Sequence, residues 1–136
     1  MSASANLQIV QRIYKAIIDG DLSTLLNAMT DDVEFIIPGS SKNPAAGSWR
    51  GRRGVEQWVA AVNGLLAFEL LQPDEFIVGR DEVVVLGHER CQMRATGHLV
   101  EVQWAHIWTL RDGLVSKARE YTDTAAWEAE FAGGGN

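Results

Sequence analysis

The sequence predicts an α+β fold in which helices cover one face of a curved antiparallel sheet. In the first half of the chain, apolar residues recur every three or four positions, as they do in amphipathic helices. The second half holds long segments of alternating apolar and polar residues, separated by turn-forming residues. A chain of 136 residues that is 46% apolar can bury one core. We therefore expect one domain over residues 1–132 and a disordered glycine-rich tail over residues 133–136.

Four helices are expected, and the first two have clear end signals. The first apolar stripe runs from Leu7 to Ile18 and stops at Gly20, the residue type that most often follows a helix. Asp21 is then the expected N-cap of a short second helix over residues 22–29. A third helix is expected from Arg52 to about residue 67, and a short final helix over residues 124–131.

Five strands are expected, the first of them over residues 33–37 and ended by Pro38. Residues 39–51 are dense in Gly, Ser, Asn and Pro, which indicates a long loop anchored by Trp49. Four longer strands follow over residues 68–79, 82–95, 98–110 and 114–122, with turn residues between them. We expect these four to form an antiparallel meander that wraps around the helices as a cone.

The last two predicted strands carry polar groups between large apolar rings. His106 lies between Trp104 and Trp108, and Glu120 follows fourteen residues later. Apolar walls shift pKa values and exclude water, so an imidazole and a carboxylate in such surroundings indicate a small-molecule acid–base site.

Whether His106 and Glu120 share a face of the sheet depends on the turn between their strands. A two-residue turn at Asp112 and Gly113 would place the two side chains on opposite faces. A three-residue loop with a left-handed Gly113 would place them on one face as diagonal neighbours. We favour the three-residue loop, because it also aligns the apolar side chains of the two strands on the concave side.

Several classes of function are excluded by composition and motifs. The net charge is −6, and basic residues cluster only at Arg50, Arg52 and Arg53, so we expect no binding to nucleic acid. Cys91 is the single cysteine, and its expected role is packing. The histidines lack metal-ligand spacing and no glycine-rich phosphate loop is present, so we expect no metal and no cofactor. Without a signal-like or membrane-spanning segment, the protein is expected to be cytoplasmic and not membrane-bound.

Three segments together resemble a known family over nearly the whole chain: AIIDGDLSTLLNAMTDDVEFIIPG, WRGRRGVEQWV and HIWTLRDGLVSKAREYTD. Their order and spacing are similar to those of the SnoaL-like and ketosteroid-isomerase-related proteins of the NTF2-like superfamily, which have the cone-shaped cystatin-like fold. The resemblance implies a small hydrophobic ligand in the cone and a homodimer formed through the outer sheet face. Ala105, Ile107 and Thr109 would leave an apolar strip on that outer face.

The resemblance also implies which branch of the family fits best. Ketosteroid isomerase is a poor match, because its catalytic base falls on Ile37 and the acid of its oxyanion hole on His106. Limonene epoxide hydrolase matches at Arg90 and Glu120, but its second acid falls on Gln92. The SnoaL-type cyclases, which place a histidine and an acid on the last two strands, fit best in kind.

We therefore predict an acid–base enzyme of the cyclase, isomerase or dehydratase type that acts on a small hydrophobic ring compound without a cofactor. Glu120 would move a proton at a carbon beside a carbonyl, and His106 or Arg90 would stabilise the enolate oxygen. Two alternatives stay open: a non-catalytic ligand-binding or accessory protein, in which Glu120 pairs with Arg90, and, less favoured, an epoxide hydrolase. The predicted lining residues are Tyr14, Phe35, Trp49, Trp58, His88, Val102, Trp104, Trp108 and Thr122.

The side of the sheet on which Arg90 lies is also open. The resemblance places Arg90 in the pocket, and His88, two residues earlier, shares its side. The opposite side of that strand, with Glu89, Cys91 and Met93, is the more apolar of the two, which would instead put Arg90 outside.

Overall fold

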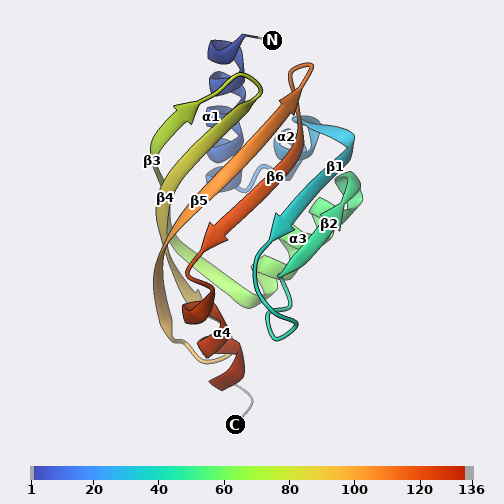
Figure 1. The fold of residues 1–136 in the computed structure, drawn as a ribbon. Coiled ribbons are helices and arrows are strands. Elements are labelled where there is room, and N and C mark those ends of the chain that lie inside the picture. The colour runs from blue at the N-terminus through green and yellow to red at the C-terminus, as the bar shows by residue number, and fades with distance from the viewer. Residues whose placement is uncertain (1, 134–136) are drawn as a thin grey trace.

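The computed structural model describes residues 2–133, which form helices packed on one curved, open sheet (Figure 1). The order of the elements is α1 (Ala3–Asp19), α2 (Leu22–Asn27), β1 (Met29–Ile37), β2 (Gly47–Arg50), α3 (Gly51–Leu65), β3 (Leu66–Val78), β4 (Glu82–Met93), β5 (Leu99–Arg111), β6 (Leu114–Thr122) and α4 (Thr124–Gly133). The predicted α+β class is confirmed. Gly133 ends α4, and the predicted disorder of residues 134–136 concerns residues outside the described part.

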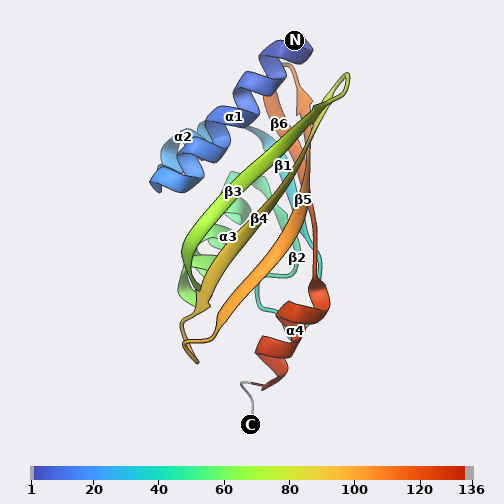
Figure 2. The ribbon, with the colours of Figure 1, turned by 90° about the vertical axis from the view of Figure 1, so that its left-hand side faces the viewer.

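The strands lie in the order β2-β1-β6-β5-β4-β3. All neighbouring strands are antiparallel except β1 and β6, which are parallel. This pairing brings the first strand beside the last one, so β5 and β6 lie in the middle of the sheet. Helices α1 and α3 cover the same face, which we call the inner face, and α4 lies at the end of the sheet near the C-terminus (Figure 2).

Both predicted end signals at the start of the chain are confirmed. Gly20 has a left-handed φ of 71°, which ends α1 without the strain that a side chain would add. The carboxylate of Asp21 accepts a hydrogen bond from the backbone N–H of Thr24 at 3.1 Å and so caps α2. The sharp turn between these two helices positions the end of α1 over the inner face.

The predicted loop over residues 39–51 was wrong in part, because it contains the edge strand β2. The indole of Trp49 donates to the carbonyl of Ala45 at 3.0 Å, and Ser48 Oγ donates to the Glu34 carboxylate at 2.6 Å. These contacts hold a four-residue segment against β1. A strand this short and rich in small residues has no periodic pattern in the sequence, since its pairing comes from the neighbouring strand. The first strand also begins earlier than predicted, at the fully buried Met29.

The prediction of a three-residue loop between β5 and β6 was wrong. The prediction that His106 and Glu120 share a face of the sheet is confirmed. Asp112 and Gly113 form a two-residue turn with φ values of 52° and 81°, both in the region that such hairpin loops require. An irregularity in the pairing follows at Ser116, which has no partner on β5. The extra residue shifts β6 by one position, so His106 lies directly opposite Glu120 on the inner face.

The core lies between the helices and the inner face. Its largest fully buried members come from α1, α3 and the strands β1, β4 and β6: Val10, Ile13, Met29, Val33, Val55, Val83, Val85 and Val115. A second cluster lies at the far end of the sheet, where Trp127 of α4 packs with Leu66, Cys91, Met93, Val100 and Val102. The predicted packing role of Cys91 is confirmed by its place in this second cluster.

The outer face of the sheet carries apolar side chains in solvent. Ala105, Ile107 and Thr109 are partly buried there, and Leu86 and Tyr121, on the strands either side of β5, are exposed. The homodimer through this face stays a prediction. Within residues 2–133, no helix has the length and the apolar character needed to cross a membrane.

Candidate functional site

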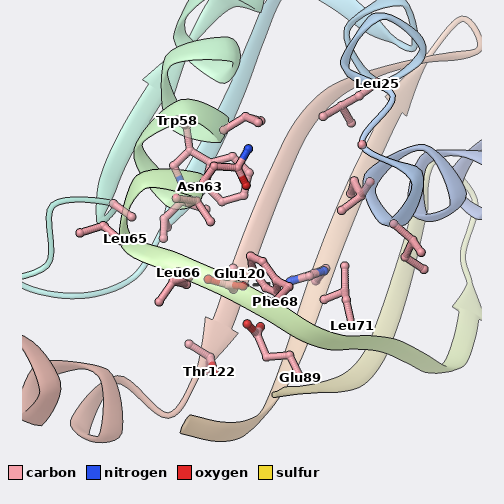
Figure 3. Close-up of a pocket in the computed structure, with 18 of the residues that line it drawn as sticks. Leu25, Trp58, Asn63, Leu65, Leu66, Phe68, Leu71, Glu89, Glu120 and Thr122 are labelled. Atoms are coloured by element: carbon pink, nitrogen blue, oxygen red, sulfur yellow. Dashed lines mark hydrogen bonds and ion pairs between the residues drawn. The ribbon is translucent and has the colours of Figure 1, made fainter. Parts of the chain in front are cut away.

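A cavity of about 780 Å³ lies between the inner face and the helices (Figure 3). Its walls are mainly apolar and come from α2, α3 and β3, including Leu25, Trp58, Leu65, Leu66, Phe68 and Leu71. Strands β4, β5 and β6 contribute four polar residues to the lining, Glu89, His106, Glu120 and Thr122. An apolar cavity with a few convergent polar groups is typical of a small-molecule site.

Three neighbouring strands place the ionisable groups of the cavity. His106 of β5 is paired with Glu120 of β6, and Glu89 lies on the adjacent strand β4. In Figure 3 the carboxylates of Glu89 and Glu120 both point into the cavity. We call Glu89 and Glu120 the carboxylate pair.

Glu89 is the functional candidate that sequence reasoning missed. Its strand alternates regularly, with Val83, Val85, Gly87, Cys91 and Met93 all buried on the same side as Glu89. This alternation was the available signal: a glutamate in register with five small or apolar residues faces the interior. A buried carboxylate of this kind is rare unless it is paired or functional.

A chain of hydrogen bonds runs from the core to Glu120. Trp108 Nε1 donates to Tyr14 Oη at 2.8 Å, Tyr14 Oη lies 2.7 Å from His106 Nδ1, and His106 Nε2 lies 3.0 Å from Glu120 Oε1. An indole N–H can only donate, so the Tyr14 oxygen accepts that bond. Among the described residues, His106 Nδ1 is then the one acceptor for the Tyr14 hydroxyl proton. The imidazole therefore carries its hydrogen on Nε2 and donates it to Glu120.

Aromatic rings fix the plane of the His106 ring. The imidazole stacks on Trp104 with ring centres 3.9 Å apart and planes 7° from parallel. The Trp108 ring lies nearly perpendicular to the imidazole, with ring centres 6.2 Å apart. Burial raises the pKa of Tyr14 far above its ordinary value, so this phenol stays protonated and keeps donating to His106. The rings and the hydroxyl together orient the imidazole that holds Glu120 Oε1, and among the described residues Glu120 Oε2 has no hydrogen-bond partner.

Glu89 is 7% exposed, and its Oε2 accepts a hydrogen bond from the Cys91 thiol at 3.0 Å. Burial raises the pKa of Glu89 to about 7; the thiol hydrogen bond lowers this pKa and the charge of Glu120 raises it. Burial also raises the pKa of the Cys91 thiol, which stays protonated. Near neutral pH, Glu89 therefore exchanges readily between an acid and a carboxylate.

Two predicted site residues lie on the opposite side of the sheet. The guanidinium of Arg90 is 2.7 Å from Glu101 and 3.7 Å from Glu69, and His88 Nδ1 is 2.6 Å from Asp74. The inward direction of Glu89 requires its two neighbours along β4 to point outward. The prediction that Arg90 and His88 face the cavity was wrong, and the ion pair between Glu120 and Arg90 does not form.

The remaining predicted lining residues divide into two groups. Trp58 and Thr122 line the cavity, as do His106 and Glu120. The others lie outside the lining layer: Tyr14, Phe35, Trp49, Val102, Trp104 and Trp108. The prediction that these six residues line the cavity was wrong, because their side chains are packed into the two core clusters.

Replacing Tyr14 by phenylalanine tests the hydrogen-bond chain. The change leaves the buried Trp108 N–H without its acceptor, and we expect a loss of about 1–3 kcal/mol in the free energy of unfolding. Urea denaturation measures this loss. Tyr121→Phe is the matched control, because Tyr121 is 53% exposed and its hydroxyl can bond to water. Equal stabilities of the two variants would show that the hydrogen-bond chain does not stabilise the core.

Within residues 2–133, no group of three or more His, Cys, Asp or Glu side chains is arranged to hold a metal ion. The chemistry that the cavity groups themselves can perform is proton transfer. A carboxylate with a fixed orientation, Glu120, and a second carboxyl group of raised pKa, Glu89, are the paired groups that acid–base reactions use.

A curved open sheet covered by helices, with such a cavity between them, defines the NTF2-like class of α+β proteins. The model of the SnoaL-like domain matches residues 10–118. The chain therefore belongs to the SnoaL-like family.

Solved structures and relatives of known sequence agree with this assignment. An NTF2-like protein of Burkholderia xenovorans LB400 is 31% identical, with a TM-score of 0.86 over 100% of this chain and 99% of that one. TerC, co-crystallised with polyporic acid, is 28% identical, with a TM-score of 0.85 over 94% of this chain and 98% of that one. An uncharacterized protein of Mycobacterium tuberculosis is 28% identical over 97% of this chain and its own whole length.

Proposed function

We propose that this protein is an acid–base enzyme of the cyclase, isomerase or dehydratase type, acting on a small hydrophobic ring compound. One observation carries the proposal: Glu120, oriented by the chain from Trp108 through Tyr14 and His106, shares an apolar cavity with Glu89. Structural carboxylates at such a depth normally meet a cation. Glu120 pairs with the imidazole of His106 and Glu89 with the thiol of Cys91, and among the described residues neither carboxylate meets a lysine or arginine.

The proposed reaction starts with proton transfer from a carbon beside a carbonyl group. Glu120 takes the proton through its free oxygen, and the electrons of the C–H bond form a carbon–carbon double bond. The carbonyl oxygen receives a proton from Glu89, which gives an enol. In a ketone with a double bond between its β and γ carbons this enol is a conjugated dienol. Return of the proton from Glu120 to the γ carbon, and of the oxygen-bound proton to Glu89, moves the double bond next to the carbonyl group and restores the Glu120 carboxylate and the Glu89 acid.

His106 is a positioning residue in this scheme. Its Nε2–H holds one oxygen of Glu120, and its own direction is set by Tyr14 and by the stack with Trp104. A fixed base loses less freedom on reaching the transition state than a mobile one. The raised pKa of Glu89 supports its role as proton donor near neutral pH.

Two further observations bear on the choice of reaction. TerC, whose fold is similar to that of this chain, was co-crystallised with polyporic acid, which supports a small organic ligand for the cavity of this chain. The outward position of Arg90 removes the residue on which the resemblance to limonene epoxide hydrolase depended. Epoxide hydrolysis is therefore not part of the proposal, and the cytoplasmic location stays a prediction.

Deuterium exchange at a carbon acid tests the proposal without knowledge of the natural substrate. We expect the protein to accelerate exchange of the α-protons of 2-tetralone in deuterated water, followed by NMR. Glu120→Gln should lower the enzymatic rate by about a hundredfold or more, because the base is lost and the shape is kept. Glu56→Gln, on the exposed side of α3, is the control and should leave the rate unchanged.

Two results would overturn the acid–base proposal. One is an exchange rate no higher than that in buffer although tetralone binds, which would leave a ligand-binding or accessory role. The other is an unchanged rate in Glu120→Gln.

A further inference from the structure

The cavity lining is strongly unbalanced in charge. Among the described lining residues Arg94 is the one cation, and five residues are acidic: Asp19, Asp21, Glu69, Glu89 and Glu120. Arg94 follows the end of β4, is exposed, and donates its Nε–H to the carbonyl of Asn63 at 2.7 Å. Its charge therefore lies at the margin of the cavity.

The acidic residues at the margin are already occupied. Asp19 lies 2.8 Å from Lys15, Asp21 caps α2, and Glu69 lies 3.7 Å from Arg90. The carboxylate pair at the sheet side differs, because its members bond only to a thiol and to an imidazole that donates one hydrogen. Negative charge in the cavity is thus concentrated where a ligand would meet the acid–base groups.

We infer that this cavity takes uncharged ring compounds bearing a carbonyl or hydroxyl oxygen and rejects carboxylate ligands. A ligand carboxylate would be desolvated beside two protein carboxylates, and like charges repel strongly at low dielectric constant. An uncharged ring meets the apolar walls without this repulsion. Below about pH 7, where Glu89 is mainly protonated, the oxygen of such a ring can also accept a hydrogen bond from Glu89. The inference rests on the proposed function in taking this cavity as the ligand site. It concerns this chain and not TerC, whose co-crystallised ligand is an acid.

Two probes of nearly equal shape test the inference: naphthyl methyl ketone, which is uncharged, and naphthoate, which is an anion. Titration calorimetry at pH 8 gives both Kd values for the wild type and for the double variant Glu89→Gln/Glu120→Gln. We expect the ketone to bind at least about tenfold more tightly to the wild type. The double variant should lower the ratio of the two Kd values at least about tenfold, because it removes the repulsion and keeps the shape.

The control is Glu56→Gln/Glu82→Gln, which makes the same change in net charge at two exposed positions. Its Kd ratio should equal that of the wild type. If the double variant of the pair does not fold, as judged by circular dichroism, each single variant should still lower the ratio in part.

Naphthoate binding as tight as ketone binding would overturn the inference. So would an unchanged ratio in the Glu89 and Glu120 variants, or a ketone that does not bind the wild type up to its solubility. These results are separate from the exchange assay: turnover that survives Glu120→Gln overturns the mechanism and leaves the charge preference standing. Loss of the charge preference with intact catalysis overturns the charge preference and leaves the mechanism standing.

Discussion

Glu89→Gln is expected to stabilise the protein more at pH 8 than at pH 4.5. The change that it causes in the free energy of unfolding should be more favourable at pH 8 by up to about 3 kcal/mol. Burial raises the pKa of Glu89 from an ordinary value of 4.5 to about 7 in the folded protein. Between these two values the folded protein holds a proton that the unfolded chain releases. The contribution of Glu89 to stability is therefore complete below pH 4.5 and is lost as the pH rises through about 7.

Glutamine does not titrate, and its amide oxygen can still accept the hydrogen bond from the Cys91 thiol. The variant should therefore lack this part of the pH dependence. Urea denaturation of both proteins at the two pH values measures the effect, with Glu56→Gln as an exposed control that should show no pH-dependent difference. A difference between variant and wild type that is the same at both pH values would mean that folding does not raise the pKa of Glu89.

Gly87→Ala is expected to destabilise the protein by about 3 kcal/mol, at the upper end of the range for overpacked interiors. Gly87 lies on the inner face of β4 between Val85 and Glu89. A Cβ atom at this position would overlap the six-membered ring of Trp104 and would lie 2.5 Å from the backbone oxygen of Gln72. The backbone oxygen belongs to the β3 ladder and cannot move away, and Trp104 is held in its stack with His106.

Thermal and urea denaturation measure the effect of Gly87→Ala, and Gly64→Ala is a matched control. Gly64 lies in α3 with open space around the position of its Cβ, so alanine there should stabilise the helix by about 0.5–1 kcal/mol. Adding Trp104→Phe to Gly87→Ala removes the overlapping ring atoms and should recover part of the loss. A Gly87→Ala variant as stable as the wild type would show that Trp104 does not occupy this position.

Much of the fold could be predicted because its signals are local. The stop at Gly20 and the cap at Asp21 each depend on residues within a few positions of one another. The short strand β2 could not be predicted, since its pairing with β1 depends on residues ten or more positions away.

The candidate site could be predicted only in part for a related reason. His106 and Glu120 stood out between aromatic residues on adjacent strands, and the structure places both in the cavity. The choice between Glu89 and Arg90 required knowledge of which of these two side chains on β4 points to the inner face. The resemblance to a family indicated the wrong side, whereas the alternation of buried residues along β4 indicated the right one.

The sequence by itself determined the α+β class, most helices and strands, and an imidazole and a carboxylate on the last two strands, because periodicity and turn chemistry act between near neighbours. The tertiary structure alone decided that an extra residue at Ser116 sets His106 opposite Glu120, that Tyr14 orients the imidazole from a distant helix, and that Glu89 joins them. Those relations depend on the packing of α1 against the sheet and on the register between strands. Both are set by contacts between residues far apart in the chain.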